Sequence, residues 1–125
     1  MFTKCAFLAF GVYAPLCFCL YFGEKNGGNY KDDPNLITKQ MNRYVKEHYP
    51  PNNSLAVTMQ LLRRHNQKDC IKAMEKWWEE IKYNSKRDQL SFNYIAWKQN
   101  LKFNYIEGDA RNNEFFSVSI HTGKK

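Results

Sequence analysis

A run of nineteen residues without a charge, from Cys5 to Gly23, constrains this chain more than any other feature of its sequence. Lys4 precedes the run and Glu24 follows it. The length is close to what an apolar helix needs to cross a bilayer. Lys4 on the short N-terminal side favours an orientation that leaves the remainder of the chain lumenal or extracellular. The sequence therefore predicts an uncleaved membrane anchor at residues 5–23, in the secretory pathway or at the cell envelope.

Two other interpretations of this run stay open. A cleaved signal peptide fits its length, although Leu20-Tyr21-Phe22-Gly23 is a poor small-x-small cleavage site. Alternatively, the run forms two buried strands broken at Gly11 or Pro15, and the chain is then expected to be cytoplasmic. The Gly-rich residues 24–30 predict a linker, so the folded domain is expected at residues 31–125.

The remainder of the chain is basic and rich in aromatic residues. The net charge is +7, and Lys4 is the only charged residue before Glu24, so the basic bias belongs to the part after the apolar run. Such a charge favours anionic partners, among them lipid headgroups and the diphosphate of a sugar nucleotide. Nucleic acid is not expected as a partner, because the basic residues are dispersed and no nucleic-acid motif occurs. Cys70 is the only cysteine outside the apolar run, so we expect neither a disulfide framework nor a zinc site.

Local signals predict an α/β arrangement of three helices and a few short strands. Asp33 can cap a helix that Pro34 opens and Pro50-Pro51 ends. The residues of a second helix place Trp77 on its apolar stripe. The expected order is helix, strand, helix, helix, strand, strand. The helices are expected to begin at Asp33-Pro34, after an N-cap at Asn66, and at Ser85. The strands are expected over residues 55–61, 103–106 and 115–120.

No general catalytic motif and no Asp-x-Asp metal motif is present, but several short segments occur in a recognisable order. They are Lys31-Asp32-Asp33-Pro34, Gln40-Met41 with Tyr44, Tyr49-Pro50, Leu62-Arg63-Arg64-His65-Asn66, Trp77-Trp78-Glu79-Glu80-Ile81 and Arg87-Asp88-Gln89-Leu90-Ser91-Phe92-Asn93-Tyr94. Residues 31–121 thereby resemble the C-terminal part of the glycosyltransferase-like domain family. This family, formerly a domain of unknown function, is found in plant Golgi proteins of cell-wall and mucilage synthesis and in bacterial and viral polysaccharide loci.

The resemblance implies a GT-A-like fold that transfers a sugar from a nucleotide sugar, with a divalent cation such as Mn or Mg, to a glycan acceptor. Members of the family carry a longer N-terminal half with the nucleotide-binding strands and an acidic metal-binding turn. Here the apolar run stands where that half should end, so we expect a domain that is truncated or joined to an unrelated, aberrant leader. Whether it transfers sugar stays open, and the alternative is a non-catalytic module that binds glycans or anionic polymers.

The family pattern places Arg87-Asp88-Gln89 toward the presumed sugar site. Asp88 is the candidate catalytic residue, because a carboxylate there can orient or deprotonate an acceptor hydroxyl. Ser85-x-x-Asp88 is also a capping box, so Asp88 has an equally good structural explanation. Arg87 and Gln89 are candidate substrate-binding residues, although an exposed helix residue is the simpler interpretation of Gln89.

Further candidates lie at element ends. Arg63 and Arg64 follow a predicted strand, where ligand sites of α/β sheets are common, and either can clamp a phosphate, with His65 beside them. Solvated surface charges are the alternative. Trp78 is a candidate platform for stacking a sugar, whereas Trp77 is expected in the core. By analogy with GT-A enzymes, His121 is a candidate metal or diphosphate ligand, unless it belongs to a loose C-terminal tail.

Overall fold

The computed structural model describes residues 2–4, 32–51, 53, 55–58, 60–106, 108–109, 111–112, 114–115 and 117–119. These residues form a mixed α and β structure, which confirms the predicted combination of helices with a few short strands. The helices are α2 (Pro34–Lys46), α3 (Lys68–Tyr83) and α4 (Asp88–Lys98), and the strands are β1 (Phe2–Lys4), β2 (Ala56–Val57) and β3 (Tyr105–Ile106).

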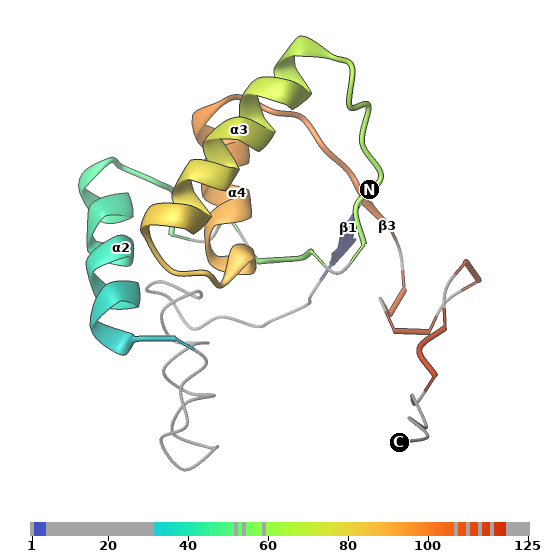
Figure 1. Cartoon of the computed structure of the whole chain (residues 1–125), viewed down its shortest axis with the longest axis horizontal. Helices are drawn as coiled ribbons and strands as arrows, with labels where there is room; N and C mark the ends of the chain where they lie inside the picture. The colour runs from blue at the N-terminus through green and yellow to red at the C-terminus, as the bar shows by residue number, and fades with distance from the viewer. Residues whose placement is uncertain are drawn as a thin grey trace.

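The three short strands form one sheet in the order β2-β1-β3. β1 pairs antiparallel with β2, with Thr3 opposite Val57, and parallel with β3, with Thr3 opposite Ile106. Figure 1 shows α2, α3 and α4 grouped together, with the strands to one side of them. The chain therefore leaves the sheet at the end of β2, passes through α3 and α4, and returns to the sheet at β3.

The predicted anchor at residues 5–23, the linker at residues 24–30 and His121 lie outside the described residues. Within the described part of the chain, no helix is long and apolar enough to cross a membrane.

Helix α2 begins as predicted but ends earlier. The Asp33 carboxylate accepts a hydrogen bond from the Asn35 N–H at 2.9 Å, and Pro34 occupies the first turn. The helix ends at Lys46 rather than at the proline pair, because His48 adopts a left-handed conformation with φ of 61°. The Tyr49 N–H then bonds back to the Tyr44 carbonyl, the pattern of a Schellman C-cap.

Helix α4 begins at Asp88 and not at Ser85, and the predicted capping box is wrong. The Ser85 N–H donates to Gln40 Oε1 at 3.2 Å, and the Ser85 hydroxyl donates to the Asp32 carboxylate at 2.7 Å. Ser85 therefore uses its polar groups to hold the α3–α4 turn against α2 and the residue Asp32 before it. A partner forty-five residues away outcompetes the local one for the Ser85 N–H.

Other boundaries also differ from the predictions: the strand expected over residues 103–106 is only Tyr105–Ile106. The strand expected over residues 55–61 is only Ala56–Val57, which pair with Lys4 and Thr3 of β1. Helix α3 is preceded by Gln67 and not Asn66 as its N-cap, without a side-chain cap. The described residues of the expected strand at 115–120 form only an isolated bridge between Asn112 and Ser117. The described apolar side chains there, Phe115 and Val118, are each 64% exposed.

The core lies between α2, α3 and α4, and α4 is its centre. Seven consecutive residues of α4, from Leu90 to Ala96, are buried, so this helix is covered on all sides. The Tyr44 and Tyr94 rings stack at 3.6 Å, and Trp77 meets Phe92 edge to face at 5.0 Å. Trp77 is 8% exposed, as expected for a core residue, whereas Trp78 is 64% exposed. The core cluster comprises Ile37, Met41, Tyr44, Tyr49, Ala56, Trp77, Leu90, Phe92, Tyr94, Ile95 and Ala96.

Glu47 joins the end of α2 to α4 and predicts an acid-sensitive contribution to stability. Its carboxylate accepts hydrogen bonds from the Lys98 ammonium and, at 2.6 Å, from the Tyr94 hydroxyl. The Lys98 bond, followed by the Tyr94 bond, lowers the pKa of Glu47 from its ordinary value of 4.5. Because the folded-state pKa is the lower one, this stabilisation is complete above pH 4.5 and is lost as the pH falls through the folded-state value.

We therefore expect Glu47→Gln to flatten the pH dependence of the free energy of unfolding below about pH 4.5, where the wild type loses this contribution. Urea unfolding of both proteins across this pH range measures the difference. Glu75→Gln, an exposed α3 residue, is the matched control and should keep the wild-type slope. Equal slopes for the wild type and Glu47→Gln would show that the Glu47 contacts do not stabilise the fold.

Candidate functional site

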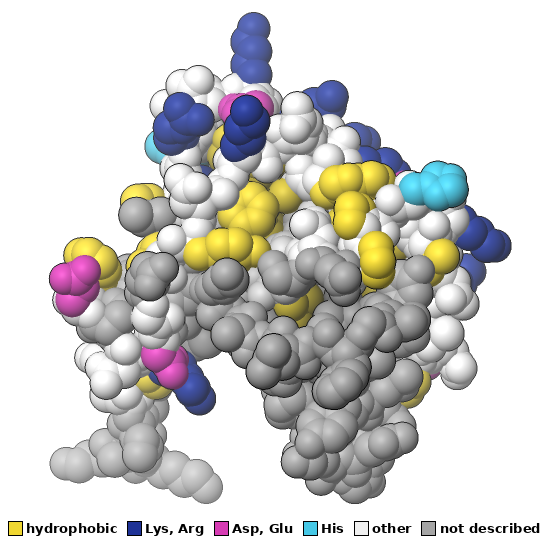
Figure 2. All heavy atoms as spheres, turned by 180° about the vertical axis from the view of Figure 1, so that it is seen from behind, with side chains coloured by type: hydrophobic (Ala, Val, Ile, Leu, Met, Phe, Trp, Pro, Cys, Tyr) yellow, Lys and Arg dark blue, Asp and Glu magenta, His cyan; other side chains and the backbone are white. Residues whose placement is uncertain are grey.

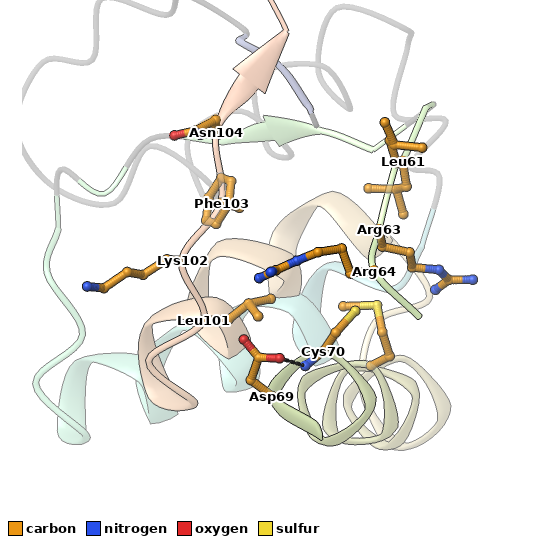
Figure 3. A pocket seen from close by; sticks show the side chains of 11 residues that line it. Leu61, Arg63, Arg64, Asp69, Cys70, Leu101, Lys102, Phe103 and Asn104 are labelled. Atoms are coloured by element: carbon orange, nitrogen blue, oxygen red, sulfur yellow. Dashed lines mark hydrogen bonds between the residues drawn. The ribbon is translucent and has the colours of Figure 1, made fainter. Parts of the chain in front are cut away.

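A cavity of about 330 Å³ lies where three segments of the chain meet (Figure 3). One wall is the segment that follows β2, another is the beginning of α3, and the third is the segment between α4 and β3. The lining residues are Leu61, Leu62, Arg63, Arg64, Asp69, Cys70, Met74, Leu101, Lys102, Phe103 and Asn104. The cavity therefore combines an apolar wall with several charged groups.

The positive charges of the cavity come from two opposite walls. Figure 3 shows the Arg64 side chain extending across the cavity toward Leu101, whereas the Arg63 side chain points away from it. Lys102 belongs to the opposite wall, but Figure 3 shows its side chain pointing away from the cavity and from Arg64. Among the ion pairs of the described residues, none involves these three cations. Of the three, Arg64 is therefore the one that can contact an anionic ligand inside the cavity.

The first turn of α3 adds to this electrostatic character. Its unpaired N–H groups form the positive end of the helix dipole, which favours anions. The Asp69 carboxylate offsets part of this potential, since its Oδ1 accepts the Cys70 N–H at 2.8 Å. The described lining residues include three cations and one carboxylate, a net charge of +2 among them. The cavity is therefore suited to a small anion that carries several hydrogen-bond acceptors, such as a phosphate.

Asp88 lies at the start of α4 and is held by three elements. Its Oδ2 accepts the Thr58 hydroxyl at 2.6 Å, directly after β2, and its Oδ1 accepts the Gln89 N–H at 2.9 Å. Its backbone carbonyl accepts the Trp77 Nε1–H at 3.3 Å from α3. The side chain is half-buried, as are those of Arg87 and Gln89 on either side. A fixed, partly accessible carboxylate of this kind can accept a hydrogen bond from a substrate hydroxyl.

The structure brings together only some of the residues predicted from the sequence. Arg63 and Arg64 both line the cavity, although only Arg64 points across it. His65 is exposed and outside the lining, and Trp78 is exposed on α3. Arg87, Asp88 and Gln89 lie together at the start of α4, and the cavity lining contains none of them. The candidate residues thus form two groups, one in the cavity and one at Asp88.

Sequence patterns missed Lys102 and Asp69. Lys102 follows α4 by only a few residues, and it reaches the cavity because the left-handed Asn100, with φ of 52°, ends the helix and turns the chain. Asn after a helical pattern is a recognisable C-cap signal, so the turn itself was predictable. The place of Lys102 on the cavity wall was not predictable, because it depends on how α3 packs against α4.

In comparisons with protein-family models, with curated proteins and with solved structures, no match to this chain was found. The resemblance to glycosyltransferase-like domains therefore stays a prediction that rests on the sequence segments. Among the residues that the structure describes, no group of three His, Cys, Asp or Glu side chains lies close enough to hold a metal ion.

Proposed function

We propose that this chain is a glycosyltransferase-like protein of glycan synthesis, and that its basic cavity binds the phosphate end of a nucleotide sugar. The observation that supports this proposal is the Arg64 side chain, which extends across a cavity at the start of α3. In this proposal the described helices and strands are the C-terminal part of a GT-A-like domain. A membrane anchor at residues 5–23 and a location in the secretory pathway or cell envelope belong to the same proposal.

The chemistry of the cavity matches that of a diphosphate. A guanidinium group such as that of Arg64 binds two phosphate oxygens at once. Backbone N–H groups at the start of α3 favour the same anion. A divalent cation, Mn or Mg, would be held mainly by the substrate phosphates and would neutralise part of their charge. The apolar wall formed by Met74, Leu101 and Phe103 can contact the uncharged part of the ligand.

Asp88 has the acceptor-side role in this proposal. Thr58 and the first turn of α4 fix its carboxylate, so it presents a defined lone-pair direction to a sugar hydroxyl. Arg87 and Gln89 flank it and supply further hydrogen-bond donors.

A non-catalytic module for glycans or anionic polymers is the second candidate function. It is favoured by one observation, namely that both Asp88 carboxylate oxygens already accept hydrogen bonds within the protein. Such a carboxylate can be purely structural. Transfer of radiolabelled sugar to a glycan by the purified protein separates the two functions, since the module binds its ligand without transfer.

The role of the cavity is tested by a matched pair of arginine variants. We expect Arg64→Ala to weaken the binding of pyrophosphate and uridine diphosphate by about tenfold or more, since a charge-assisted hydrogen bond contributes roughly 1.5 to 3 kcal/mol. Arg63→Ala removes the same charge from a side chain that points away, so we expect a change of about twofold or less. Isothermal titration calorimetry at fixed ionic strength measures both.

Equal losses for the two variants would show that only the general positive potential attracts the anion. Unchanged affinity in Arg64→Ala would remove the cavity from the proposed function. Circular dichroism of both variants checks that they keep the helical content of the wild type.

A further inference from the structure

The exposed face of α2 carries a regular pattern of amide and ammonium groups. Asn35, Lys39, Asn42 and Lys46 follow one another at intervals of four, three and four residues. This spacing places them in one stripe along the helix. All four residues are exposed, and the buried residues of α2, namely Ile37, Gln40, Met41 and Tyr44, occupy the other side. The stripe is therefore a continuous polar surface about 16 Å long.

This stripe borders a shallow groove of about 470 Å³. The described lining includes three cations and no carboxylate, and α2 itself contains no acidic residue. Figure 2 shows Lys and Arg side chains projecting at the edge of the molecule where α2 lies. The described residues that line the groove are Asn35, Thr38, Lys39, Asn42, Arg43 and Lys46.

The internal contacts of α2 show which of these groups a ligand can use. Arg43 is engaged by Glu80 and Glu47, and the Thr38 hydroxyl donates to the Pro34 carbonyl at 2.8 Å. Lys39 and Lys46 form no ion pair with any residue that the structure describes. Lys46 is favoured by the C-terminal end of the helix dipole, but Lys39 in the middle of α2 has no such explanation.

We propose that this face of α2 binds an acidic glycan. Such a glycan would be the acceptor of the proposed sugar transfer, and this acceptor assignment rests on the proposed function. A polyuronate presents carboxylates and hydroxyls in alternation along its chain. Ammonium groups pair with carboxylates, and side-chain amides both donate to and accept from hydroxyls, so Asn and Lys in alternation match both groups. The stripe offers no base-stacking aromatic, which single-stranded nucleic acid favours, and no apolar anchor for a lipid surface.

The experiment measures retention of the full chain on immobilised alginate, a polyuronate, with no nucleotide sugar present. We expect Lys39→Glu with Lys46→Glu to weaken alginate binding by about tenfold or more, because two attractive charges become repulsive. The matched control is Lys72→Glu with Lys82→Glu on α3, which makes the same charge change elsewhere and should cost about threefold or less. Equal losses in the two double variants would overturn the assignment to α2.

A second variant distinguishes a glycan from other polyanions. Asn35→Ala with Asn42→Ala keeps every charge, and we expect it to weaken alginate binding severalfold while polyphosphate and single-stranded DNA binding stay unchanged. A parallel loss for all three polymers, a preference for DNA, or retention on vesicles of anionic lipid in place of alginate would each overturn the proposal. Arg64→Ala should retain alginate binding, so failure of nucleotide binding and failure of glycan binding are observed separately.

Discussion

Glu80→Ala is expected to lower the free energy of unfolding by about 3 kcal/mol, because it removes the one carboxylate around which α2 and α3 share their buried polar groups. Glu80 is 8% exposed. Its Oε1 accepts the Tyr44 hydroxyl at 2.8 Å and Gln40 Nε2 at 3.1 Å, and it pairs with Arg43. Without the carboxylate, these donors from α2 lose their shared acceptor inside the protein.

The network is tightly coupled. Burial, followed by the nearby Glu80 charge, raises the pKa of the Tyr44 phenol well above its ordinary value, so Tyr44 stays protonated and can donate to the carboxylate. Gln40 also joins this group to the α3–α4 turn, because its Oε1 accepts the Ser85 N–H. Loss of Glu80 therefore disturbs the contact between all three helices and not a single pair.

Glu79→Ala is the matched control for Glu80→Ala. Glu79 is the preceding residue, and its side chain is 53% exposed and pairs with Lys76 on the surface. An exposed pair of this kind contributes about 0.5 kcal/mol or less, so the control should unfold almost as the wild type does. Urea unfolding followed by circular dichroism measures both. A loss below about 1 kcal/mol in Glu80→Ala would mean that water replaces the carboxylate and that the network does not hold the helices together.

The first residue of a helix was predictable where the residues that cap it are adjacent in the sequence. Asp33 followed by Pro34 correctly places the start of α2, because both residues act within one turn. The end of α2 was not predictable from the proline pair, since His48 in a left-handed conformation closes the helix earlier. Its Schellman cap is supported by the edge-to-face contact of Tyr44 with Tyr49 at 5.9 Å, which forms only once the chain has turned.

The third helix shows why tertiary contacts limit such predictions. Ser85 and Asp88 have the spacing of a capping box, yet their polar groups bind Gln40, Asp32 and Thr58 from distant segments. The burial of seven consecutive α4 residues also exceeds what a single apolar stripe indicates. A helix surrounded by other elements loses the amphipathic pattern on which its prediction depends.

The residues of the cavity were predictable only in part. Arg63 and Arg64 were expected at the end of a strand, but β2 ends at Val57, well before them, and both still line the cavity. Lys102, on the opposite wall, lies 38 residues beyond Arg64 in the chain and is brought to the cavity by the packing of α3 and α4. Trp77 connects these two helices beside Asp88, because its Nε1–H donates to the Asp88 carbonyl.

Trp77→Ala is expected to lower the free energy of unfolding by about 3 to 5 kcal/mol, whereas Trp78→Ala changes it by about 1 kcal/mol or less. Trp77 is 8% exposed, whereas Trp78 is 64% exposed. The Trp77 Nε1–H also donates to Ser91 Oγ at 3.1 Å and to the Asp88 carbonyl at 3.3 Å. Trp77→Phe keeps most of the apolar volume and removes these hydrogen bonds, so we expect it to lose about 1 to 2 kcal/mol. Urea unfolding of the three variants measures the series. Comparable losses in Trp77→Ala and Trp78→Ala would contradict this packing, because adjacent positions with such different burial cannot contribute equally to a core.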